Sequence, residues 1–168
     1  KATINSHEFV EAIKTDLIYD EVYVFTPKGK IVNLKSGSTP IDFAYELHTE
    51  LGNKAIACRV NRKFAPLNIR LENGQSIEII TSDKQEASPD WLNFVVTSKA
   101  RSSIRLALRN QKISQSRKAG KLMLENELRR GGVTLDHYRG SKMSRILEML
   151  GVKSLNELLT DLGSGKKT

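Results

Sequence analysis

The chain has 168 residues, of which 39% are hydrophobic and 6% aromatic, so it is long enough for one ordinary domain or two small ones. Its single cysteine, Cys58, excludes an internal disulfide and a cysteine-rich metal site, and the surrounding strand pattern predicts a buried thiol. The formal net charge of +8 lies in the second half: residues 1–82 hold ten Lys and Arg against ten Asp and Glu, whereas residues 83–168 hold seventeen against nine. A one-sided basic surface favours a polyanionic or acidic partner, although a solvated helical face rich in Lys and Arg has the same composition.

The sequence shows neither a signal peptide nor an apolar run of about 18 residues. We therefore expect a cytoplasmic location and no membrane partner. Because the chain begins at Lys1 instead of Met, we interpret it as a piece of a longer protein.

Residues 4–19 place apolar side chains on one helical face, so we predict a helix that packs on the next domain or on a segment missing from this piece. A strand pattern, rich in β-branched and aromatic residues, then recurs between turn signals. The predicted strands are residues 22–26, 30–34, 55–60 and 76–81, with turns at 27–29, 61–63 and 73–74.

A helix is predicted at residues 40–51, between the second and third strands. Ser38 and Thr39 are good helix caps, and a proline occupies the first helical position, where it is tolerated best. Asp42 in the first turn complements the positive end of the helix dipole. Gly52 is predicted to end the helix in the left-handed conformation.

The order of elements predicts an α+β protein: a β-grasp domain on a mixed sheet over residues 21–82, followed by an all-α domain. Residues 83–90 are polar and contain a proline, so we interpret them as a linker. Residues 91–163 have helical patterns, and residues 164–168 are expected to be a disordered tail. The expected helices are residues 97–112, residues 116–130, a short helix from Ser141 or Ser144 to Leu150, and residues 154–162.

Catalytic signals are weak throughout the sequence. The three histidines, His7, His48 and His137, are scattered without the spacing of a metal site. No glycine-rich phosphate loop or nucleophile elbow is present. We therefore expect no catalytic residue, no metal and no cofactor in this chain.

His48 is the first candidate for binding, because it lies near a helix end with a turn behind it. A flat ring and an N–H suit an unpaired nucleotide, and stacking on an aromatic ring contributes about 1–3 kcal/mol per base. The alternative is a surface histidine bound to its own helix end.

A second candidate is a basic stripe in the helix predicted at residues 97–112. Arg101, Arg105, Arg109 and Lys112 recur at helical spacing, and such a face would match a phosphate backbone. The alternative is an exposed face that contacts acidic groups of a neighbouring domain.

The run EVYVFTPKGKIVNLKSGSTPIDFAYELHTELG, with the later turn at Gly74 and the string IEIIT, resembles a TGS domain. The strings VFTPKG and TP-DFAY-LH are similar to those of the long RelA/SpoT homologues, which make and destroy the alarmone (p)ppGpp. The resemblance continues through DWLNFVVTSKARSSIR to NELLTDLGSG, which is similar to the adjacent helical domain, so it covers residues 14–165. The string WLNFVVTSKAR resembles the bifunctional SpoT-type branch.

In this family the hydrolase and synthetase domains precede the TGS domain, so the resemblance implies that residues 1–20 are the end of the linker from the synthetase domain. The resemblance therefore implies a non-catalytic regulatory region of a stringent-response enzyme, which contacts those domains and sets the balance between synthesis and hydrolysis. The alternatives are an RNA-binding module and an internal scaffold that packs on the catalytic domains.

The resemblance also implies two partners. RelA-type TGS domains grip the 3′ CCA end of uncharged tRNA on the ribosome; His48 matches the first histidine of the family's HxxxGH stretch, and Asn53 replaces the second. SpoT-type TGS domains are implicated in binding acyl carrier protein, which is strongly acidic. The TGS candidates for tRNA or partner binding are His48, Asn53, Lys54, Arg62 and Lys63, and the helical candidates are Lys99, Arg101, Arg105, Arg109 and Lys112.

Overall fold

The computed structural model describes Val10 and residues 21–166, and the chain divides into two compact units, residues 1–108 and 109–168. The linker expected at residues 1–20, with its predicted helix at residues 4–19, lies outside the described residues apart from Val10.

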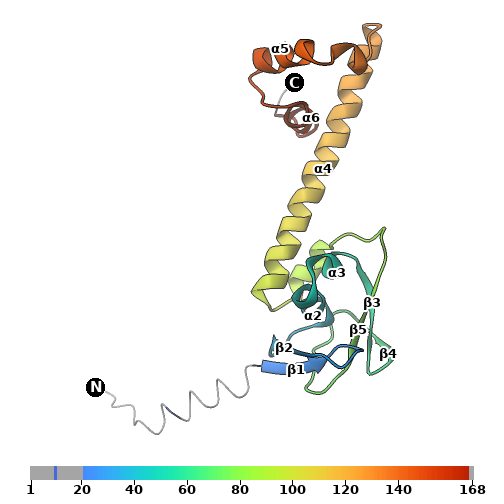
Figure 1. The fold of residues 1–168 in the computed structure, drawn as a ribbon, viewed down its shortest axis with the longest axis vertical. Helices are drawn as coiled ribbons and strands as arrows, with labels where there is room; N and C mark the ends of the chain where they lie inside the picture. Colours follow the sequence, from blue (N-terminus) through green and yellow to red (C-terminus); the bar gives the residue numbers. More distant parts are fainter. Residues whose placement is uncertain (1–9, 11–20, 167–168) are drawn as a thin grey trace, which may run out of the picture. The chain divides into compact units, whose positions relative to one another are not determined.

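The described part of the first unit begins with short strands and short helices (Figure 1). In chain order these are β1 (Glu21–Phe25), β2 (Ile31–Lys35), α2 (Pro40–Leu47), α3 (Thr49–Asn53), β3 (Ala55–Val60), β4 (Lys63–Ala65) and β5 (Ile77–Thr81). The predicted α+β class is confirmed. β4 was not predicted, because a three-residue strand after a tight turn carries almost no periodic signal in the sequence.

The strands form two antiparallel sheets. β1 pairs with β2, while β3 lies between β4 and β5. Among the described residues, a single parallel bridge between Phe25 and Ser76 links the two sheets, so the mixed sheet expected from the sequence is observed as two antiparallel sheets. Along the first hairpin, alternate residues point into the core: Val22, Val24, Val32 and Leu34.

The helix predicted at residues 40–51 is broken at His48, so this part of the prediction is wrong. His48 has extended backbone angles (φ −155°, ψ 140°) and caps both the end of α2 and the start of α3. The break sets α3 against Tyr45, whose hydroxyl donates a hydrogen bond to Asn53 Oδ1 at 2.7 Å. Gly52 is not left-handed; a Cβ at this position would overlap the Tyr45 ring, so glycine is needed for close packing.

Cys58 is fully buried in β3, as predicted, and its thiol donates to the carbonyl oxygen of Ala65 at 3.1 Å. Burial raises the pKa of this thiol.

A second core cluster of the first unit lies on the other face of α2. Ile41 and Tyr45 of α2 pack there with Trp91 of the short 3-10 helix η1 (Pro89–Asn93), and with Ala100 and Ile104 of α4 (Ser98–Arg130). The sequence predicts a linker at residues 83–90 and a helical domain that starts at residue 91. In the structure the compact units divide between residues 108 and 109, because these apolar side chains complete the core of the first unit.

Asp42 joins α2 to the start of α4. Its carboxylate is fully buried and accepts hydrogen bonds from the backbone N–H and the hydroxyl of Thr39. The backbone N–H of Asp42 in turn donates to the Thr39 hydroxyl oxygen at 3.4 Å, which completes a capping box. The carboxylate also accepts from the backbone N–H of Val96 (3.1 Å) and from the backbone N–H and hydroxyl of Thr97 (2.9 and 2.8 Å). One carboxylate thus lies at the N-terminal ends of two helices, where negative charge is favoured.

Helix α4 runs without interruption through 33 residues. The two helices predicted at residues 97–112 and 116–130 are therefore one helix. The intervening residues 113–115 contain no Gly or Pro, and serine and glutamine do not end a helix in the absence of a competing cap.

The second unit contains the later part of α4, the 3-10 helix η2 (Leu135–Tyr138), α5 (Ser141–Leu150) and α6 (Leu155–Gly163). Gly120 of α4 and Gly163 of α6 let these two helices approach backbone to backbone. The tail expected at residues 164–168 is ordered at its start, because the N–H of Lys166 donates to the carbonyl oxygen of Asp161 at 2.9 Å.

Candidate functional site

His48 is exposed at the break between α2 and α3. Among the described residues, its imidazole has no hydrogen-bond partner, so the alternative of a histidine bound to its own helix end is not what the structure shows. The ring is therefore accessible for stacking or for hydrogen bonding with a ligand.

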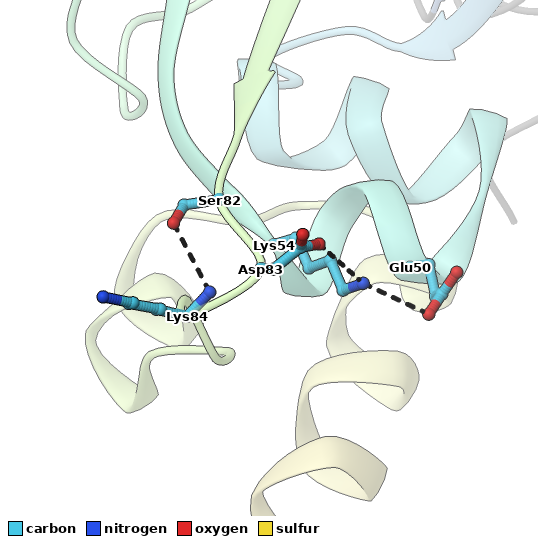
Figure 2. A network of polar contacts seen from close by, with 5 residues as sticks. All are labelled: Glu50, Lys54, Ser82, Asp83 and Lys84. Atoms are coloured by element: carbon cyan, nitrogen blue, oxygen red, sulfur yellow. Dashed lines mark hydrogen bonds and ion pairs between the residues drawn. The ribbon is translucent and has the colours of Figure 1, made fainter.

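Asn53 and Lys54 lie near His48 in the chain but are already engaged. The Asn53 side chain accepts from Tyr45, and burial raises the pKa of that tyrosine. Lys54 Nζ lies 3.3 Å from an Asp83 oxygen and 3.6 Å from a Glu50 oxygen (Figure 2). The hydrogen bond to Asp83, reinforced by the charge of Glu50, raises the pKa of Lys54. Its charge is largely compensated, so Lys54 offers less to an anionic ligand than its position predicts.

Arg62 and Lys63 lie at the opposite end of β3 from Asn53 and Lys54. Six strand residues at about 3.3 Å each separate the two ends by about 20 Å. The five TGS candidates therefore form two separate groups: one at the break between α2 and α3, and one in the turn between β3 and β4.

The turn between β3 and β4 carries an exposed aromatic residue that sequence analysis overlooked. Phe64 of β4 is 70% exposed, and the Arg59 guanidinium carbon lies 4.8 Å from its ring centroid. Arg59 also pairs with Glu78 of β5 at 3.3 Å. Phe64 directly follows two cations in the sequence, and an exposed aromatic beside cations is typical of a surface that stacks bases.

Backbone strain accompanies the charges of this turn. Asn61 and Arg62 both have positive φ (51° and 69°), the combination that favours Asn-Gly in a two-residue hairpin turn. We expect Arg62→Gly to raise the free energy of unfolding by about 0.5–1 kcal/mol, because the substitution relieves a left-handed arginine. Denaturant unfolding followed by Trp91 fluorescence measures this change, and Lys63→Gly, at a position without positive φ, is the matched control that should not stabilise.

The five helical candidates also differ in what they contact. Lys99 Nζ donates to the carbonyl oxygen of Glu46 at 3.0 Å and pairs with its carboxylate at 3.6 Å. Arg101 donates to the carbonyl oxygen of Val95 at 3.0 Å. The remaining three are exposed and form no ion pair with a described residue: Arg105, Arg109 and Lys112. Of the five helical candidates, Lys99 and Arg101 are thus held by contacts within the first unit, and the other three are open to solvent.

Among the described residues, no group of three or more His, Cys, Asp or Glu side chains is arranged to hold a metal ion. Nor does any described helix combine the length and apolarity needed to cross a bilayer.

Comparison with known proteins places this arrangement in a family. Residues 22–81 match the TGS domain, and residues 107–168 match the RelA/SpoT AH domain. The chain is 42% identical over 161 residues to the bifunctional (p)ppGpp synthase/hydrolase SpoT of Escherichia coli, and the aligned region covers 96% of this chain and 23% of that protein. It is 38% identical over 161 residues to the bifunctional (p)ppGpp synthase/hydrolase RelA of Mycobacterium tuberculosis, with 94% and 22% covered. A GTP pyrophosphokinase of Myxococcus xanthus is 38% identical over 162 residues, with 96% and 21% covered.

The chain is therefore a TGS domain followed by a RelA/SpoT AH domain. It is similar to the TGS and AH region of the SpoT and RelA (p)ppGpp enzymes named above, and it spans about a quarter or less of the length of these relatives (21–23%). The resemblance stated from the sequence is confirmed.

Proposed function

We propose that this chain is a partner-sensing regulatory region of a cytoplasmic bifunctional (p)ppGpp enzyme, and that its partner is the single-stranded 3′ end of uncharged tRNA. The observation that carries the proposal is the exposed imidazole of His48, which has no hydrogen-bond partner among the described residues. A histidine in this state loses no internal contact when a base stacks on it.

The contacts that α2 makes near His48 explain how ligand binding at this residue would affect other parts of the first unit. Lys99 of α4 binds Glu46, two residues before His48, and Asp42 binds the two residues that precede α4. A ligand at the end of α2 therefore acts on a helix that is bound to α4 and to the two residues that precede α4. It shifts the balance of hydrolase and synthetase only if it binds one arrangement of the whole enzyme better than another.

Binding of fluorescently labelled uncharged tRNA, followed by anisotropy, tests the proposal. We expect His48→Ala to weaken binding about tenfold, because stacking contributes about 1–3 kcal/mol per base. The affinity should also fall with salt, with a logarithmic slope of about −0.7 for each phosphate neutralised on a single strand. Thermal unfolding should not change, since the His48 side chain is exposed.

His137→Ala is the matched control, because this histidine is also exposed but lies in the second unit. Aminoacylated tRNA should bind less well than uncharged tRNA, since the free CCA end is then blocked. If His48→Ala binds uncharged tRNA as well as the unchanged chain does, the proposal fails.

Acyl carrier protein is a second candidate partner, favoured by the excess of cations in the second unit. Residues 109–166 hold twelve Lys and Arg against six Asp and Glu. In this case Arg105→Glu combined with Arg109→Glu should abolish binding of acyl carrier protein, whereas His48→Ala should leave it unchanged. Binding of neither partner would favour an internal scaffold that contacts the hydrolase and synthetase domains.

A further inference from the structure

The second unit contains an open apolar groove between α4, α5 and α6, with a volume of about 580 Å³. Leu124 and Leu128 of α4 form one wall, and Met143 and Ile146 of α5 form another. Its lining is almost entirely aliphatic, with a single tyrosine, Tyr138. Grooves of this size and composition are typical of binding sites.

Met149 of α5 is the most exposed large apolar side chain among the described residues, at 86% exposure, although it also lines this groove. Methionine is flexible and polarisable, and it is common on surfaces that bind helices of varied sequence. The groove thus has a solvent-facing apolar edge that no described residue covers.

Positive charge lies beside this apolar edge. Lys142 and Arg145 precede Met149 by seven and four residues on α5, so they lie on the same flank of the helix. Both are exposed, and neither forms an ion pair with a described residue. Glu148, the acidic residue of α5, is turned further from the groove than Arg145, because successive residues of a helix are about 100° apart.

We propose that this groove binds the apolar face of an acidic amphipathic helix from a partner protein. An amphipathic helix inserts side chains at i, i+3, i+4 and i+7 into such a groove, and acidic residues on its flank would meet Lys142 and Arg145. A second copy of this chain is a poorer occupant, because its own second unit carries the same excess of positive charge. The inference does not depend on the ligand of His48.

Two designed helical peptides test the proposal on the complete 168-residue chain. Both carry leucine at i, i+3, i+4 and i+7; one has glutamate and the other lysine at all flanking positions. We expect the glutamate peptide to bind at least about tenfold more tightly in fluorescence anisotropy, because its flank complements the cations of α5. Combined Lys142→Glu and Arg145→Glu substitutions should reverse this preference.

Met149→Glu should weaken binding of the glutamate peptide about tenfold or more, since it removes apolar contact and adds a like charge. Met123→Glu is the matched control, because Met123 is 51% exposed on α4 and does not line the groove. His48→Ala should not affect peptide binding, so failure here is distinct from failure at His48. Equal binding of both peptides, binding of neither, or a dimer in sedimentation that Met149→Glu dissociates would overturn the proposal.

Discussion

Replacing Asp42 with alanine is expected to lower the free energy of unfolding of the first unit by about 3–5 kcal/mol, because several hydrogen-bond donors lose a charged acceptor at once. The carboxylate is fully buried and holds Thr39, Val96 and Thr97. The substitution leaves the N–H groups of Val96 and Thr97 without their acceptor, and each buried donor without a partner costs about 1–3 kcal/mol.

The measurement is denaturant unfolding followed by fluorescence. Trp91 is the only tryptophan of the chain and packs in the core cluster next to Tyr45, so its signal reports the first unit. Asp42→Asn should fall between the wild type and alanine, since an amide oxygen still accepts hydrogen bonds but carries no charge. Asp83→Ala is the control with an exposed carboxylate, for which a change below about 0.5 kcal/mol is expected. A change that small for Asp42→Ala would contradict its role.

Only half of this role was predictable from the sequence. Asp42 three residues after Thr39 is a local capping pattern, and the capping box is present in the structure. Its other partners lie 54 and 55 residues further along the chain. A contact at such separation leaves no periodic trace in a single sequence. The sequence therefore predicts a linker at residues 83–90 and a helical domain from residue 91, although part of this segment belongs to the core of the first unit.

The candidate site shows the same division between local and tertiary information. Exposure of His48 followed from its place at a helix end, but the break of the helix at that residue did not, because it accompanies a side-chain contact between Tyr45 and Asn53 that a single sequence does not reveal. The excess of basic residues could be counted directly from the sequence. Which of them are compensated by carboxylates, as Lys54 is, depends on strands and turns that bring Asp83 near (Figure 2).

Replacing Gly120 with alanine is expected to lower the free energy of unfolding, although alanine has a higher helix propensity than glycine. This is the second large effect that we expect. In the interior of an exposed helix this change stabilises by about 1 kcal/mol. Here the new Cβ would overlap the carbonyl oxygen of Leu159, which belongs to the backbone of α6 and has no rotamer to adjust. The helices must separate, and we expect a net loss of about 3 kcal/mol from the second unit, at the upper end of overpacking effects.

The change is measured as a lower denaturation midpoint for the helical circular dichroism of the second unit, while the Trp91 fluorescence transition keeps its midpoint. Gly163→Ala meets the carbonyl oxygen of Ser116 in the same way and should cost a similar amount. The double variant should cost less than the sum of the two, because helices separated by one methyl group already accommodate the other. Gly131→Ala is the matched control: its nearest neighbour lies 3.4 Å from the added Cβ and its φ is not positive. If Gly120→Ala were as harmless as Gly131→Ala, the close approach of α4 and α6 would be wrong, and with it the wall spacing of the apolar groove.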